Sequence, residues 1–376
     1  MPAQIYLDLS ELMAAPLRTG IQRIEREAIR HWPGPASLVP CCVDSGGHLA
    51  RLPQAVLDVL CAEDNGSPAA REAERRMLAS LAAAATPIPA EDLTRLLNLE
   101  LFFSPIRADA HLRAAAAGTR VLWYLYDFLP FLRPDLFPPG LTKTCMHFLR
   151  GLRAATCIAF LSEQTRRDYI RRVARAPLAE GTGPVLLPGA DGLQLERQIF
   201  SPNRRDFVAI GTVEPRKNPQ ALLEAFELLW NRGTAVRLIV AGRMSPEAKE
   251  AHAFFARHAG NPNFMVLEQP SDETLRALLR NARAVVMPSE AEGFGLPPYE
   301  ALHSGIPAIA SARLPSAALL SGGAMLLERM DAPSIAAAVT SLLDDATAAR
   351  LWNEAAGVRL PTWAAFGWTL GTWAQG

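Results

Sequence analysis

The sequence lacks an excess of charge of either sign. Its 376 residues include 38 basic and 38 acidic side chains, so the formal net charge at pH 7 is zero. We therefore expect no nucleic-acid partner. No uninterrupted apolar run reaches the roughly 18 residues of a membrane-spanning helix. The N-terminus, Met-Pro-Ala-Gln-Ile-Tyr-Leu-Asp, has neither the basic start nor the apolar core of an export signal. These absences predict a cytoplasmic protein.

Cysteine is scarce as well. The chain has five cysteines, an odd number with no paired spacing: Cys41, Cys42, Cys61, Cys145 and Cys157. This pattern argues against a disulfide framework or a structural metal site. Small buried hydrophobic side chains are the favoured interpretation.

Length and composition predict two α/β domains. A chain of this size exceeds one ordinary core, and two domains of about 180 residues each are expected. Apolar runs alternate with amphipathic stretches, which is typical of parallel sheets covered by helices on both faces. The polar stretch between Gly189 and Arg205 is the expected hinge, so we place the first domain at 1–195 and the second at 196–360. The apolar runs Leu99–Phe103 and Arg120–Tyr126 are predicted strands of the first domain.

The strongest candidate site lies between a predicted buried strand ending at Met287 and a predicted helix. Pro297 and Pro298 suit the first turn of that helix, and Gly305 suits its end. Two acids, Glu292 and Glu300, flank the heptapeptide Gly-Phe-Gly-Leu-Pro-Pro-Tyr.

Main-chain N–H groups at a helix start have no partner inside the helix and can bind a ligand. The amides of Gly293, Phe294 and Gly295 are placed for this role. Two carboxylates and several amides at the carboxyl end of a parallel strand suit a polyhydroxylated ligand such as a sugar and a ribose, rather than a metal ion. Ordinary helix-start chemistry explains each feature taken singly.

A second candidate site follows the run Phe207–Gly211. Asn218 suits an N-cap and Pro219 the first residue of a helix, which places Arg216 and Lys217 beside the positive end of that helix. A cation there opposes the helix dipole and costs stability unless an anion compensates. These two side chains are therefore predicted to meet an anion.

The segment Glu-Gly-Phe-Gly-Leu-Pro-Pro-Tyr-Glu resembles the signature of glycosyltransferase family 4, whose members are retaining, nucleotide-sugar-dependent enzymes of the GT-B fold. The resemblance is clearest over residues 206–311. It implies that Glu292 contacts hydroxyls of the donor sugar, that Glu300 binds the ribose, and that Arg216 and Lys217 bind the donor diphosphate. It also implies that successive main-chain groups hold the sugar and phosphate: Gly293, Phe294, Gly295 and Leu296.

The resemblance is weaker in the first domain. Gly20 resembles a glycine that comes close to the donor diphosphate, although a plain helix start explains it equally well. Relatives commonly have His-Asp where this chain has Tyr126-Asp127. A donor-contacting role for Tyr126 and a catalytic role for Asp127 at the mouth of a cleft are the implied functions. The alternative for Asp127 is a turn cap before Pro130.

The fold implied by the resemblance is GT-B, with two Rossmann-like domains facing a cleft and a C-terminal helix, 361–376, crossing back to the first domain. The implied reaction moves a hexose from GDP-mannose or a UDP-hexose to a hydroxyl acceptor in polysaccharide or glycolipid assembly, without a metal or other cofactor. Two alternatives stay open: a sugar-nucleotide epimerase of the same fold, and a catalytically silent nucleotide-sugar-binding scaffold.

One basic stretch of the sequence is relevant to the question of binding partners. Seven arginines lie within residues 150–175: Arg150, Arg153, Arg166, Arg167, Arg171, Arg172 and Arg175. A solvated helix face is the commonest explanation of such a run. The alternative is a peripheral contact with an anionic membrane surface.

Overall fold

The computed structural model describes residues 4–34, 37–62, 67–174 and 183–376. The chain divides into two compact units. The first consists of the chain up to Pro134 together with Pro139–Gly189 and Pro361–Gly376, and the second of Asp135–Pro138 and Ala190–Leu360. The division follows Gly189, within the stretch predicted to be the hinge but before the predicted boundary at residue 195. Arg175 lies outside the described residues.

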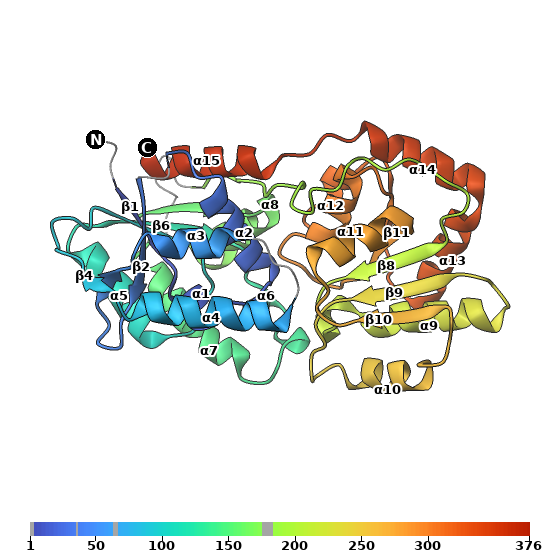
Figure 1. Ribbon diagram of the computed structural model, residues 1–376, viewed down its shortest axis with the longest axis horizontal. Helices are drawn as coiled ribbons and strands as arrows, with labels where there is room; N and C mark the ends of the chain where they lie inside the picture. Colours follow the sequence, from blue (N-terminus) through green and yellow to red (C-terminus); the bar gives the residue numbers. More distant parts are fainter. Residues whose placement is uncertain (1–3, 35–36, 63–66, 175–182) are drawn as a thin grey trace. The chain divides into compact units, whose positions relative to one another are not determined.

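The first unit is built on a seven-stranded sheet of order β4-β3-β2-β1-β5-β6-β7 (Figure 1). Its strands are β1 (Ile5–Asp8), β2 (Leu38–Val43), β3 (Leu49–Arg51), β4 (Thr86–Pro87), β5 (Arg95–Asn98), β6 (Arg120–Leu125) and β7 (Cys157–Phe160). The pairs from β2 to β7 are parallel, whereas β3 and β4 run antiparallel to their neighbours. Its helices are α1 (Ser10–Ala14), α2 (Gly20–Arg30), α3 (Ala55–Cys61), α4 (Pro68–Ala82), α5 (Pro105–Ala116), α6 (Leu129–Leu132), α7 (Leu141–Leu152), α8 (Glu163–Arg172) and α15 (Trp363–Gln375).

The second unit is an all-parallel, six-stranded sheet of order β10-β9-β8-β11-β12-β13. Its strands are β8 (Asp206–Ile210), β9 (Arg237–Ala241), β10 (Phe264–Leu267), β11 (Ala282–Met287), β12 (Ala308–Ser311) and β13 (Ala324–Leu327). Its α-helices are α9 (Pro219–Asn231), α10 (Lys249–Arg257), α11 (Asp272–Asn281), α12 (Leu296–His303), α13 (Ala332–Leu343) and α14 (Asp345–Gly357). The predicted strand-helix alternation is confirmed.

The cores follow from the apolar runs. Every residue of β11 is buried, as expected of a central strand in a sheet covered on both faces. Phe207 of β8 packs edge-on against Phe226 of α9, with 5.9 Å between ring centroids. In the first unit, Trp123 of β6 packs against Phe102 and Phe148. Each unit therefore has a hydrophobic core of its own.

The predicted strand Leu99–Phe103 is wrong, because the strand at this place is β5, Arg95–Asn98. The polar ends of β5 obscured it in the sequence. Arg95 donates to the Ala374 carbonyl at the end of α15, and Asn98 is fully buried among polar partners. Both side chains have polar partners outside the strand, which an apolar-run criterion does not detect.

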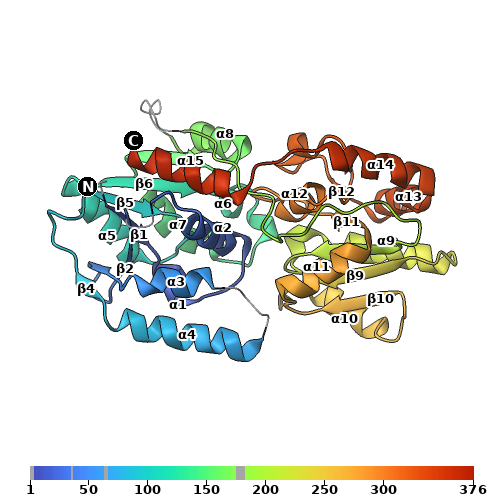
Figure 2. The ribbon, with the colours of Figure 1, turned by 45° about the horizontal axis from the view of Figure 1, so that its top comes forward.

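The C-terminal helix α15 packs along α2 within the first unit, and Figure 2 shows the two helices side by side. The Thr362 hydroxyl caps its start by accepting from the Ala365 amide at 3.2 Å. Trp363 and Phe366 are buried, while Arg120 donates to the carbonyl of Gly376 at 2.7 Å. The helix α15 is therefore part of the first unit.

Candidate active site

The loop after β11 and the start of α12 carry the first candidate site. Gly295 has a left-handed φ of +102° and immediately precedes α12, which begins at Leu296. Any side chain at Gly295 would be strained by that backbone conformation. Gly305, with φ +76°, follows the helix end as predicted. Glu300 lies in the middle of α12 and is 4% exposed.

The loop after β8 carries the second candidate site. Pro215–Lys217 form one turn of 3₁₀ helix, and Pro219 begins α9 as predicted. Asn218 holds the N-cap position, but its side chain makes no capping bond. Its amide instead donates to the Met330 carbonyl at 2.7 Å, because the left-handed φ of +52° turns the residue away from the helix start. The predicted capping role of the Asn218 side chain is therefore wrong.

The two loops meet because β8 and β11 are neighbouring strands. Arg216 Nη1 lies 2.5 Å from Glu292 Oε2, and Lys217 Nζ lies 3.8 Å from Glu292 Oε1. The Ser289 hydroxyl donates to the same Oε1 at 2.9 Å. A main-chain bond from the Glu290 amide to the Arg216 carbonyl, at 2.9 Å, holds the loops together. We call Arg216, Lys217 and Glu292 the ionic cluster.

The charge of Glu292 is set by this environment. Burial acts to raise the pKa of its carboxyl, but the nearby Lys217 and Arg216 cations outweigh burial, so the pKa lies below the usual range. Arg216 also pairs with Glu214 at 2.8 Å. The anions that compensate the two cations in this structure are therefore the protein's own carboxylates, and an arriving diphosphate would compete with them.

Two glycines allow close approaches near Lys217, Gly211 to its side chain and Gly242 to the main chain of the neighbouring loop. A Cβ atom at Gly211, whose φ is +126°, would come within 2.6 Å of Lys217 Nζ. A Cβ atom at Gly242, directly after β9, would lie 2.0 Å from the Gly211 carbonyl oxygen. Real Cβ atoms essentially never lie so close to a main-chain oxygen, so the loops after β8 and β9 approach each other only because residue 242 is glycine. Gly242 was missed in the sequence, where its only signal is a glycine after a buried strand.

A small apolar pocket opens beside Lys217. It has a volume of about 40 Å³ and is lined in part by Thr212, Leu222, Val240 and Phe255. This space is of the order of a few water molecules. It does not accommodate a nucleotide as it stands.

The predicted site residues of the first unit have different surroundings. Gly20 is the exposed first residue of α2, where the Thr19 hydroxyl accepts the Gln22 amide. The Tyr126 ring is 5% exposed and its hydroxyl donates to the Leu99 carbonyl at 2.6 Å. The structure therefore does not place the Tyr126 hydroxyl on a ligand-facing surface.

The Asp127 carboxylate binds a main-chain amide two residues further along the chain. Its Oδ1 accepts the Leu129 amide at 2.9 Å, at the start of α6. This is the capping alternative considered for Asp127. Its predicted catalytic role stays a prediction.

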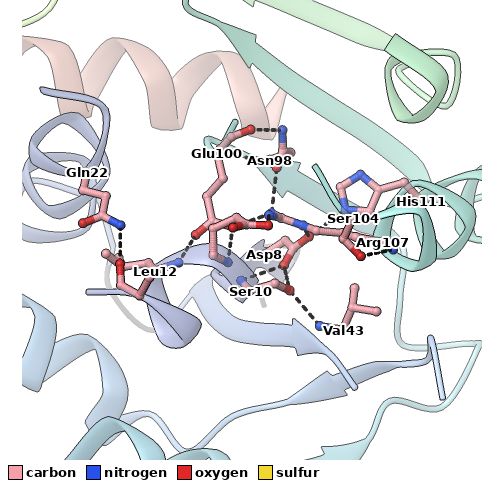
Figure 3. A network of polar contacts seen from close by, with 12 residues as sticks. Asp8, Ser10, Leu12, Gln22, Val43, Asn98, Glu100, Ser104, Arg107 and His111 are labelled. Atoms are coloured by element: carbon pink, nitrogen blue, oxygen red, sulfur yellow. Dashed lines mark hydrogen bonds and ion pairs between the residues drawn. The ribbon is translucent and has the colours of Figure 1, made fainter. Parts of the chain in front are cut away.

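A buried polar network in the first unit was missed by sequence reasoning (Figure 3). Asp8 at the end of β1 accepts from Arg107 Nε and contacts His111 Nε2, both at 2.7 Å. Burial works to raise the Asp8 pKa, but Arg107 and His111 hold it well below its usual range. The polar residues of this network lie far apart in the chain, so no local pattern identifies them.

The described part of the chain contains no group of three or more His, Cys, Asp or Glu side chains that could hold a metal ion. Within the same residues, no helix is both long enough and apolar enough to cross a membrane.

Comparisons with solved structures define the fold class. HepE of Anabaena, solved in complex with UDP and glucose, superposes over 99% of both chains with a TM-score of 0.69 and 15% identity. Sucrose-phosphate synthase of Thermosynechococcus elongatus matches over 98% of this chain and 97% of that chain, with a TM-score of 0.67 and 17% identity. The fold, two parallel-sheet units, is that of the GT-B glycosyltransferases.

Sequence comparisons match the second half of the chain to glycosyltransferases. Residues 194–358 match the model of the family described as glycosyl transferases group 1. Serotype-specific mannosyltransferase WbdA of Escherichia coli is 36% identical over 215 residues, which make up 52% of this chain and 26% of WbdA. O-antigen chain mannosyltransferase B of E. coli is 33% identical over 250 residues, 64% of each protein. This chain thus spans about a quarter of the length of the WbdA relatives. The match to the glycosyl transferases group 1 family is thus a similarity of residues 194–358, within the second unit.

Proposed function

We propose that this protein is a retaining glycosyltransferase of family 4 that moves a hexose from a nucleotide-diphosphate sugar to a hydroxyl acceptor in polysaccharide or glycolipid assembly. The ionic cluster is the observation that carries the proposal. It joins two cations and an ionised glutamate at the carboxyl ends of two adjacent parallel strands, where open α/β sheets bind ligands.

The difficulty of the transfer is the negative charge that builds on the departing nucleoside diphosphate. Arg216 and Lys217 already lie together at the site, so they stabilise that charge once the diphosphate competes with their carboxylate partners. Glu292, held as an anion, accepts hydrogen bonds from sugar hydroxyls. The amides at the start of α12 add donors for the sugar and the phosphate, and Glu300 binds the ribose.

We further propose that no metal takes part, since the two cations supply the positive charge that a metal would supply. Retention follows if the acceptor hydroxyl attacks from the face on which the diphosphate leaves. A mannosyl donor such as GDP-mannose is favoured because the E. coli relatives are named mannosyltransferases. A UDP-hexose is the second candidate, since HepE was solved with UDP and glucose.

The test is a ligand screen followed by product analysis. GDP, UDP, GDP-mannose and UDP-glucose are compared by thermal shift, with AMP as control. A ligand present at 100 times its Kd raises the stability of the folded state by about 2.7 kcal/mol. A sugar transferred to an added hydroxyl acceptor supports the proposal. An altered donor sugar formed without acceptor identifies an epimerase, and binding without any turnover identifies a silent scaffold.

We also propose that α8 and the end of α7 contact an anionic membrane surface. Arg167, Arg171 and Arg172 are exposed, and Ile170 between them is 45% exposed. Each cation near an anionic surface contributes about 1 kcal/mol at physiological ionic strength. Apolar and basic side chains together suit an interfacial helix face.

Cosedimentation with liposomes tests this contact. The protein is expected to bind vesicles with anionic lipid and to leave neutral vesicles in the supernatant. The double variant Arg171→Glu/Arg172→Glu should weaken binding at least about tenfold. The matched control is Arg75→Glu/Arg76→Glu on α4, where both side chains are exposed. Equal binding to both vesicle types contradicts the proposal.

A further inference from the structure

The segment between β1 and α2 lies at the ligand-binding edge of the first sheet. β2 pairs with one side of β1 and β5 with the other, so the chain connections diverge from β1 in opposite directions. Ligands of open α/β sheets bind at such a switch point, beyond the carboxyl ends of the strands. Residues Leu9–Thr19 occupy this position, directly after β1 and before Gly20.

Glu100, which follows β5, holds this segment. Its Oε1 accepts the Leu12 amide at 2.7 Å and its Oε2 accepts the Glu11 amide at 3.0 Å. Arg107 Nη2 lies 2.5 Å from the same Oε2, and Figure 3 shows Glu100 between Arg107 and the start of α1. Both carboxylate oxygens therefore act as acceptors. Three N–H donors on two oxygens favour the ionised form, which has acceptors only.

A second carboxyl group lies close by without a partner. Glu25 of α2 is 1% exposed. Neither of its oxygens has a hydrogen-bond partner among the described residues. A buried carboxylate without partners is costly, so this carboxyl group is expected to keep its proton. Burial, and after it the charge of Glu100, raise the pKa of Glu25 well above the ordinary value.

The other ionisable groups around the two acids come from five helices or strands and from the segment after β6. They are Asp8 of β1, Cys41 and Cys42 of β2, Glu11 of α1, Arg26 of α2, Arg107 and His111 of α5, and Tyr126 after β6. Arg107 is the cation shared between Asp8 and Glu100. Arg26 pairs with Glu74 at 2.8 Å.

We propose that Glu100 is a positioning residue of the transfer reaction, which holds the segment Leu9–Thr19 in its ligand-binding conformation. In this arrangement Glu25 is the protonated acid of the pair, so that Glu100 stays ionised. This inference rests on the proposed function for its effect on turnover. Its effect on the segment itself is independent of any substrate.

The arrangement makes the segment sensitive to pH in both directions. Burial, opposed in part by Arg107, raises the pKa of Glu100 to about 7. Protonation of Glu100 occupies one oxygen and removes an acceptor from α1, so acid loosens the segment. Ionisation of Glu25, whose pKa is raised by burial, places a second buried negative charge beside Glu100 as the pH rises.

The same shifts affect stability with a definite sign. Both acids bind their protons more tightly in the folded chain than at the ordinary value of 4.5. The contribution of these protons to the free energy of unfolding is complete below pH 4.5. It falls as the pH rises through the pKa of each acid in the folded chain, which for Glu100 is about 7. The variant Glu25→Gln has no proton to lose at this position. Its melting temperature should therefore decline less with rising pH than that of the wild type.

Hydrogen exchange of the full-length protein tests the positioning role. In Glu100→Gln, the protection of the Glu11 and Leu12 amides is expected to fall about tenfold, the equivalent of one hydrogen bond. Turnover with the donor identified by the screen should fall about tenfold because the segment is misplaced. Calorimetric binding of the matching nucleoside diphosphate should remain, since the ionic cluster is intact. Glu163→Gln, an exposed acid of α8, is the control that leaves all three unchanged.

The pH profile separates positioning from a merely structural role. In the wild type, kcat should fall below the pKa of about 7, and Glu100→Gln should lose this acid limb. A uniform loss of kcat at every pH, or unchanged protection, overturns the proposal. Lower protection with unchanged kcat also overturns it. A wild type that turns over no donor refutes the proposed function instead, and exchange alone then decides whether Glu100 holds the segment.

Discussion

Lys217→Ala is expected to lower kcat for donor turnover about 100-fold, the loss seen when one preorganised donor to a developing oxyanion is removed. Stability should change little. The Lys217 ammonium lies 3.8 Å from Glu292 with 19% of its side chain exposed, and such pairs contribute at most about 1 kcal/mol. Activity is therefore lost from a folded protein. Steady-state hydrolysis or transfer with the identified donor, together with a melting curve, measures both.

A matched control is available in the same unit. Lys249 is the exposed first residue of α10, and Lys249→Ala removes an equal charge away from the ionic cluster. It should retain wild-type kcat. If Lys217→Ala turns over the donor at the wild-type rate, the assignment of the diphosphate to this cluster is wrong. Arg216→Ala is expected to show a comparable loss of kcat, with a larger loss of stability because Arg216 bridges Glu214 and Glu292.

Arg107→Met is expected to destabilise the first unit by about 3–5 kcal/mol. Arg107 is 1% exposed and contacts both Asp8 and Glu100, which are also buried. Removing the cation leaves two carboxylates without their shared partner. Methionine keeps much of the volume, so the loss reports on charge rather than on a cavity. Thermal or urea unfolding followed by circular dichroism measures it.

A control variant and the pH dependence of stability test the same loss. Arg113→Met, an exposed arginine on the same helix, should cost no more than about 1 kcal/mol. In the wild type, the lowered pKa of Asp8 contributes stability that is present above 3.8, its ordinary value, and is lost as pH falls below it. Arg107→Met should show less of this acid loss. An equally stable variant would mean that the network contributes nothing to stability.

Much of the second unit was predictable because its signals are local. The strand β11 ends at Met287 as its apolar run predicted, and Pro219 begins a helix as its fixed φ favours. Arg216, Lys217 and Glu292 were singled out from helix-start and strand-end chemistry. Their side chains contact one another in the structure.

The first unit was less predictable because its polar residues have distant partners. Arg95 and Asn98 flank a strand that an apolar-run criterion misses. Asp8 binds Arg107 across 99 residues of sequence, and Glu100 binds the Leu12 amide across 88 residues. Tyr126 was expected near a ligand, yet its hydroxyl binds the Leu99 carbonyl.

The sequence by itself determined the α/β class, the order of strands and helices in the second unit, and the identity of the residues in the ionic cluster. These depend on apolar periodicity, proline and glycine positions and helix-start preferences, all of which act over a few residues. Only the tertiary structure decided which charges neutralise one another. It paired Glu292 with Arg216 and Lys217, and it buried Glu25 beside Glu100, because the order of strands in each sheet sets which loop ends become neighbours.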